Sequence, residues 1–113
     1  MSGTYVKKNL RGQDFARQNL SGVSFTLSDL QGCIFTDAVL RGANFNGCKM
    51  QGAELANCDM SGAELWGAKL MGANLRGALL AGADLRSADL TNAILDDADL
   101  SGAILDGAIG YKR

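Results

Sequence analysis

A period of five residues that never slips is the strongest constraint on how this chain can fold. Every fifth residue from Leu10 to Leu105 is Leu, Phe or Met, which makes twenty consecutive apolar centres. The residue two places before each centre is small in most repeats, with twelve Ala and three Cys. The residue two places after each centre is Gly thirteen times; Asn, Asp or Ser, which suit turns, replace it in most other repeats, and Arg17 and Leu27 are departures. This regularity predicts one structural unit per pentad.

The period excludes the two common regular structures. An α-helix turns about 100° per residue, so a step of five would turn about 140° and spread the apolar centres around the whole helix. In a straight strand, side chains alternate between two faces, so an odd period would place successive centres on opposite faces. The chain must therefore bend once per pentad, with each centre directed to a shared interior and the Gly column at the bends.

Several pentads carry a family resemblance. Residues 73–77 read Ala-Asn-Leu-Arg-Gly and residues 83–87 read Ala-Asp-Leu-Arg-Ser, and both resemble the A-(D/N)-L-x-x unit of the pentapeptide-repeat proteins. The resemblance spans residues 8–109 and implies an all-β fold, a right-handed quadrilateral β-helix of about five coils with four pentads in each. Coils spaced about 4.8 Å apart would make a rod roughly 24 Å long. We expect a single domain over residues 1–113.

The two ends of the repeat differ in polarity. Lys8, Gln13 and Gln18 stand where later repeats have a small residue, which predicts a polar N-terminal cap over residues 1–18. At the other end the apolar residues are Ala103, Ile104, Leu105, Ala108, Ile109 and Tyr111. We expect residues 110–113 to be a short C-terminal segment without a capping helix. We expect this apolar end to join a second copy in a symmetric dimer.

Most of the unusual apolar residues are expected in the core. With four pentads per coil, residues twenty apart stack, which predicts the aromatic pairs Phe15–Phe35 and Phe25–Phe45. Met50 and Met60 are centres and should fill the interior. All three cysteines, Cys33, Cys48 and Cys58, fall in the small column, where burial raises the pKa of a thiol and blocks access to it.

The residues needed for catalysis are missing. The chain has no His, no G-x-S-x-G elbow and no phosphate-binding glycine loop. The cysteine spacings match no zinc site, and the densest carboxylates, Asp96, Asp97 and Asp99, do not have the spacing of a calcium loop. We therefore expect no enzymatic activity, and no catalytic, cofactor or metal site.

The outer surface is the expected site of function. Trp66 should project outward, with Arg86 twenty residues later placed to lie over its indole ring. The candidate protein-contact residues are Trp66, Met71, Leu79, Arg86, Ile104, Ile109 and Tyr111. A candidate acidic surface is formed by Asp84, Asp89, Asp96, Asp97, Asp99 and Asp106.

Two functional hypotheses follow. The first is a non-catalytic interaction or scaffold protein whose protein partner the residues do not identify. The alternative rests on the resemblance, because some family members resemble duplex DNA in shape and charge and bind DNA gyrase, protecting the enzyme from quinolones or inhibiting it. This chain departs from them, since it is shorter and its formal net charge is only −1.

The charge and hydropathy patterns limit the remaining partners. Four basic residues near the N-terminus, without interleaved aromatics, do not predict direct nucleic-acid binding. The sequence contains no run of eighteen apolar residues, so we expect no membrane span. No apolar stretch of secretory length follows Lys7 and Lys8, so we expect no signal peptide. The expected compartment is the cytoplasm, where the cysteines would stay reduced.

Overall fold

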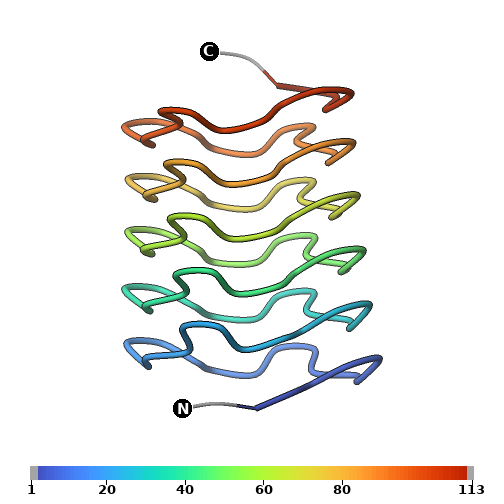
Figure 1. The fold of residues 1–113 in the computed structure, drawn as a ribbon. Helices are drawn as coiled ribbons and strands as arrows, with labels where there is room; N and C mark the ends of the chain where they lie inside the picture. The colour runs from blue at the N-terminus through green and yellow to red at the C-terminus, as the bar shows by residue number, and fades with distance from the viewer. Residues whose placement is uncertain (1–2, 112–113) are drawn as a thin grey trace.

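The computed structural model describes residues 3–111, which form a rod of stacked four-sided coils (Figure 1). Within this range there is no helix and no strand longer than one residue. Isolated parallel bridges instead join residues twenty apart, from Thr4–Ser24 to Asp89–Ile109. Four pentads therefore close one coil, which confirms the expected quadrilateral β-helix. Residues 1–2 of the predicted cap and 112–113 of the predicted C-terminal segment lie outside the described residues.

Backbone hydrogen bonds tie each coil to the coils on both sides of it. The N–H of Leu30 donates to the carbonyl oxygen of Lys49, 2.7 Å away in the next coil, and the N–H of Lys49 donates back to Ser28 at 3.1 Å. The N–H of Cys33 donates to Leu30 at 3.1 Å and closes the turn between two sides. The same pattern recurs along the rod, so most interior backbone groups are paired without extended strands.

Each corner depends on one residue in the left-handed backbone region. Every residue two places after a centre, from Lys7 to Gly107, has a φ between 55° and 73°. Glycine adopts this conformation without a steric penalty, which explains the Gly column. Arg17 and Leu27, the two departures in that column, take the same conformation with φ of 62° and 61°. The stacking of the coils therefore overrides the local preference of these two residues.

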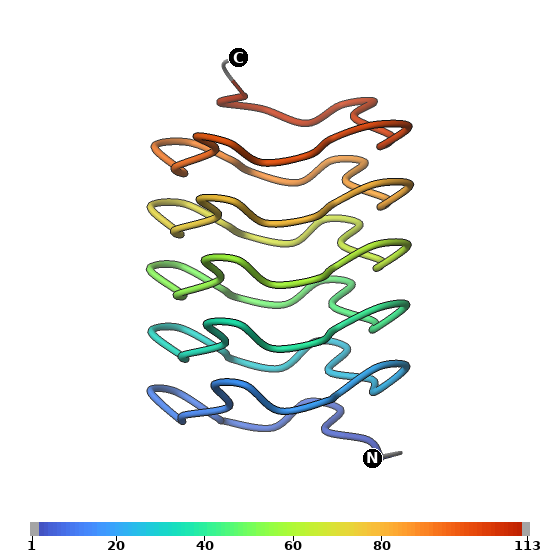
Figure 2. The same ribbon diagram turned by 90° about the vertical axis from the view of Figure 1, so that its left-hand side faces the viewer.

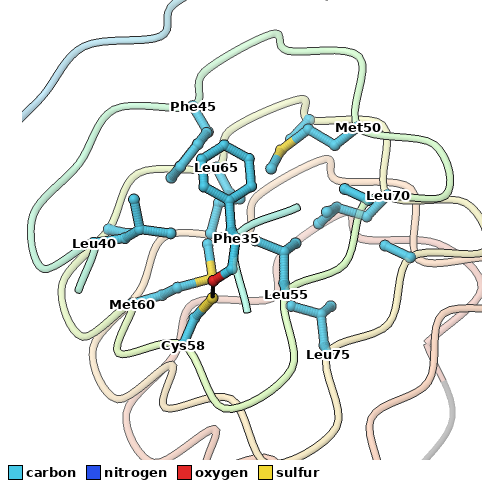
Figure 3. Packing of buried hydrophobic residues seen from close by; sticks show 14 of the residues in the cluster. Phe35, Leu40, Phe45, Met50, Leu55, Cys58, Met60, Leu65, Leu70 and Leu75 are labelled. Carbon is cyan, nitrogen blue, oxygen red and sulfur yellow. Dashed lines mark hydrogen bonds between the residues drawn. The ribbon is translucent and has the colours of Figure 1, made fainter. Parts of the chain in front are cut away.

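The core runs the length of the rod. All centres from Leu20 to Leu90 are at most 1% exposed, and Met50 and Met60 are completely buried as predicted (Figure 3). The ring centroids of Phe15 and Phe35 lie 5.1 Å apart, and those of Phe25 and Phe45 lie 5.0 Å apart, with nearly parallel planes. Both predicted aromatic stacks are confirmed.

One further centre precedes those recognised in the sequence. Tyr5 lies five residues before Leu10 and stacks on Phe25 with ring centroids 5.4 Å apart. Thr4 makes a bridge to Ser24, and Lys7 has the positive φ of a corner. The rod extends over 32 × 20 × 19 Å, longer than the 24 Å expected, in part because of this additional pentad.

The rod has four walls, which we number by their bridge residues. Figures 1 and 2 show the coils from two perpendicular directions, with the two termini at opposite ends. Wall 1 carries Thr4, Ser24, Asn44, Glu64, Asp84 and Ile104. Wall 2 carries Asn9, Asp29, Lys49, Lys69, Asp89 and Ile109. Wall 3 carries Asp14, Ile34, Glu54, Asn74 and Ile94, and wall 4 carries Asn19, Val39, Asp59, Leu79 and Asp99.

Candidate functional site

The C-terminal end of the rod leaves apolar groups incompletely covered. Leu100, Leu105 and Tyr111 are only partly buried, unlike the centres of the middle coils. Around the rim, Ile94 is 43% exposed, Ile104 42% and Ile109 57%. Sequence reasoning selected Ile104, Ile109 and Tyr111, and the structure brings all three to this end together with Ile94, which it missed.

Backbone donors are also unpaired at this end. In the middle coils the N–H of each centre donates to the coil that follows, as Leu75 does to Ile94 at 2.8 Å. The N–H groups of Leu95, Leu100 and Leu105 have no hydrogen-bond partner among residues 3–111. An open coil of this kind presents donors to any chain that packs on it.

The N-terminal end has a different surface. Lys8, Gln13 and Gln18 are exposed, although the same column is buried from Val23 to Ala88. Their polar groups remain in solvent, and the ring of Tyr5 covers Phe25 beneath them. The two ends of the rod are therefore not equivalent.

Trp66 lies in the turn between wall 1 and wall 2. Trp66 is 53% exposed, and its backbone N–H donates to Oδ1 of Asn46, 2.9 Å away. The expectation that Arg86 covers the indole is wrong. The guanidinium of Arg86 binds Asp84 instead, with Nε to Oδ1 at 3.0 Å and Nη2 to Oδ2 at 2.8 Å. The hydrogen bond from Arg86 lowers the pKa of the Asp84 carboxyl.

The candidate contact residues do not form a single patch. Trp66 and the half-buried Met71 flank wall 2 on its two sides. Leu79 is 43% exposed on wall 4, which is the opposite side of the rod. Ile104, Ile109 and Tyr111 lie at the C-terminal end, whereas Arg86 binds Asp84 of wall 1.

Wall 2 carries two basic residues that sequence reasoning missed. Lys49 and Lys69 form a parallel bridge, so their side chains leave adjacent coils side by side. Both are exposed, and within residues 3–111 neither side chain makes an ion pair or a hydrogen bond. The signal in the sequence was identical charge at a spacing of twenty.

The acidic residues are distributed around the rod. Asp84, Asp89 and Asp99 stand on walls 1, 2 and 4, and Asp96 and Asp97 form the corner after wall 3. Asp106 lies in the corner above Arg86. These carboxylates do not line one face, and the described residues contain no group of three or more side chains suited to a metal ion.

The three cysteines are buried and unpaired by disulfides. Burial raises the pKa of Cys58 to about 12 and that of Cys48 to about 11, and it raises the pKa of Cys33 as well. Neutral, inaccessible thiols are poor nucleophiles. The three cysteines are therefore core residues, as their place in the small column predicted.

No helix within the described part of the chain is long and apolar enough to cross a membrane.

Comparisons with known proteins agree with this architecture. The family model described as pentapeptide repeats matches in 8 copies, at residues 9–37, 38–77 and 68–107. No curated protein matches the sequence significantly.

Solved structures are also similar. A pentapeptide repeat protein from the Arabidopsis thaliana thylakoid lumen is 31% identical with a TM-score of 0.68, covering 89% of this chain and 63% of its own length. HetL from Nostoc sp. strain PCC 7120, involved in heterocyst differentiation regulation, is 35% identical over 94% of this chain and 46% of its own, with a TM-score of 0.43. Rfr23 from the cyanobacterium Cyanothece 51142 is 28% identical over 94% and 90% of the two chains, with a TM-score of 0.42. The chain thus spans less than two thirds of the length of the Arabidopsis protein. The fold of the chain is a right-handed quadrilateral β-helix.

Proposed function

The chain belongs to the pentapeptide-repeat family, whose model matches residues between 9 and 107, and from this premise we propose that it is a non-catalytic interaction scaffold. The observation that carries the proposal is the difference between the two ends of the rod. One end is polar, and the other leaves partly buried leucines and unpaired backbone donors at its surface. An end of this kind is suited to packing against another protein surface.

The occupant of the C-terminal end in this proposal is a second copy, joined end to end. A head-to-tail contact would press the polar side chains of Lys8, Gln13 and Gln18 of one copy against the apolar end of the next, and removing these polar groups from water is costly. A contact between two C-terminal ends places apolar groups against apolar groups. Such a symmetric contact closes at two copies and does not propagate into a fibre.

The dimer should be weak. The backbone cross-section of 20 × 19 Å gives an end of roughly 400 Å² per copy, about half of what a standard stable interface uses. Asp97 and Asp106 lie near this end, so their carboxylates would repel those of the other copy. Added salt screens that repulsion, and the dimer should therefore tighten as the salt concentration rises.

Sedimentation equilibrium over a range of concentrations tests this contact. The wild type should show a monomer–dimer equilibrium, and Ile109→Asp should remove the dimer by placing a charge in the apolar contact. Ile34→Asp is the matched control, because Ile34 is also an exposed bridge residue but lies on wall 3 in a lower coil. A monomer at every concentration, or equal effects of the two substitutions, would contradict the proposal.

A role as a DNA mimic that binds gyrase is the alternative. It has weaker support, because the six candidate aspartates occupy several sides of the rod and the formal net charge is −1. A gyrase supercoiling assay distinguishes the two roles, since a scaffold without gyrase affinity leaves supercoiling unchanged at saturating protein. The cytoplasmic location remains a prediction.

A further inference from the structure

Wall 2 contains a pair of like charges, Lys49 and Lys69, on adjacent coils. Among the bridges of residues 3–111, only two join like charges, Lys49–Lys69 and Glu64–Asp84. Directly opposed like charges destabilise a ladder. The acidic pair is relieved, because Asn46 donates to Glu64 at 3.3 Å and Arg86 binds Asp84. Each lysine is bridged on its other side to an aspartate, Asp29 or Asp89, but neither ammonium makes a hydrogen bond or an ion pair among the described residues. Their N–H donors are therefore available to an external anion.

Two apolar residues flank Lys69 on its own coil. On the coil that carries Lys69, Trp66 precedes it by three residues and Met71 follows it by two, so they stand in the turns at the two edges of wall 2. The indole is 53% exposed. An exposed aromatic ring beside a basic pair can contact an apolar side chain of the same ligand that the lysines bind.

Two aspartates limit the length of the basic patch. Asp29 lies one coil before Lys49, and Asp89 lies one coil after Lys69 on the same wall. Asp29 is bound by Arg11 at 2.8 Å, and Asp89 accepts from Oγ1 of Thr91 at 2.6 Å. With coils about 4.8 Å apart, a long anion running along the rod would meet a carboxylate at either end of the pair. This arrangement favours a short acidic segment over a nucleic-acid strand.

We propose that wall 2 binds a short acidic peptide segment of a partner protein. Two carboxylates of the segment pair with Lys49 and Lys69, and an apolar side chain packs against the indole of Trp66. The inference rests on the proposed role of the rod as an interaction scaffold and assigns the chemistry of one partner. It uses a wall of the rod and not its C-terminal end, so the two contacts are separable.

Intrinsic fluorescence can measure this binding, because Trp66 is the only tryptophan in the chain. The probe is a blocked five-residue peptide of alternating glutamate and leucine, titrated at low salt. It should produce a saturable change in Trp66 emission, and a peptide with glutamine in place of glutamate should not. The double variant K49Q/K69Q should weaken binding by about tenfold or more.

The matched control is K7Q/K8Q, which removes the same charge at the N-terminal end and should leave the affinity within about twofold. Three results would overturn the proposal: no saturable change up to about 5 mM peptide, equal weakening in both double variants, or tighter binding of single-stranded oligothymidine than of the acidic peptide. Sedimentation of K49Q/K69Q separates this site from end-to-end pairing, since the variant should dimerise like the wild type.

Discussion

The thiol of Cys58 donates a hydrogen bond to the carbonyl oxygen of Phe35, with Sγ and O 2.7 Å apart (Figure 3). Phe35 is a centre of the preceding coil, and its carbonyl oxygen also accepts the N–H of Ala38 at 2.9 Å. Cys33 and Cys48 make the equivalent bonds to Leu10 and Phe25. The thiols therefore give interior carbonyls a second donor while filling the place of an alanine.

This burial predicts a loss of stability at alkaline pH. The pKa of Cys58 is raised to about 12 and that of Cys48 to about 11, above the value of about 8.5 for an unfolded thiol. The contribution of the neutral thiols to the free energy of unfolding is fully present below about pH 8.5, and it is lost as the pH rises toward the pKa values of the thiols in the folded protein. Urea unfolding at about pH 8 and pH 10 should show a larger decrease in unfolding free energy for the wild type than for Cys48→Ala/Cys58→Ala. Rapid labelling of the folded protein by a thiol reagent would contradict the account.

Replacing Leu27 with glycine should stabilise the folded protein. It holds a φ of 61° in a turn and its side chain is 53% exposed, so Leu27→Gly should relieve backbone strain and raise the free energy of unfolding by about 1 kcal/mol. Gly52→Ala is the reverse experiment, because residue 52 has a φ of 68° and an added Cβ would meet no atom within 4 Å. It should destabilise by a similar amount, measured by urea unfolding. The Leu27 side chain lies over Gly47, where an added Cβ would be 2.7 Å from Cδ2 of Leu27. If Leu27→Gly destabilises the protein instead, the loss of this packing outweighs the relief of strain.

The polar side chains at the N-terminal end should prevent the rods from forming assemblies larger than a dimer. The triple variant K8A/Q13A/Q18A should make this end resemble the apolar end, because Ala fills the same column in most later pentads. Both ends could then pack, and light scattering should show species larger than a dimer that grow with concentration. K7Q/K8Q keeps polar side chains at this end and should not form them. A triple variant no larger than the wild type would show that these side chains do not limit assembly.

Most of the fold could be predicted from the period, because an apolar residue every fifth position leaves few ways to share an interior. Tyr5 was missed because its pentad has Gly3 in the small column and Lys7 in the corner, so only the spacing marks it. The position of Arg86 was wrong because spacing alone ignores Asp84, which is two residues away and offers two oxygens to the guanidinium.

The significance of the lysine pair on wall 2 could not be predicted from the sequence. Lys49 and Lys69 are unremarkable one at a time, and their significance depends on which residues accept hydrogen bonds around them. The twenty-residue register could be predicted from the family resemblance. The pairing of Glu64 and Asp84 with other donors, and the lack of an acceptor for the lysines, came only from the side-chain positions.

Amide hydrogen exchange measured by NMR at increasing protein concentration tests the proposed end-to-end contact most directly. The N–H of Leu75, bonded to Ile94 within the rod, should exchange slowly at every concentration. The N–H groups of Leu95, Leu100 and Leu105 should exchange rapidly in dilute protein and slow down as dimers form. Rapid exchange of these three groups in a sample that sediments as a dimer would contradict the account, because the copies would then meet elsewhere.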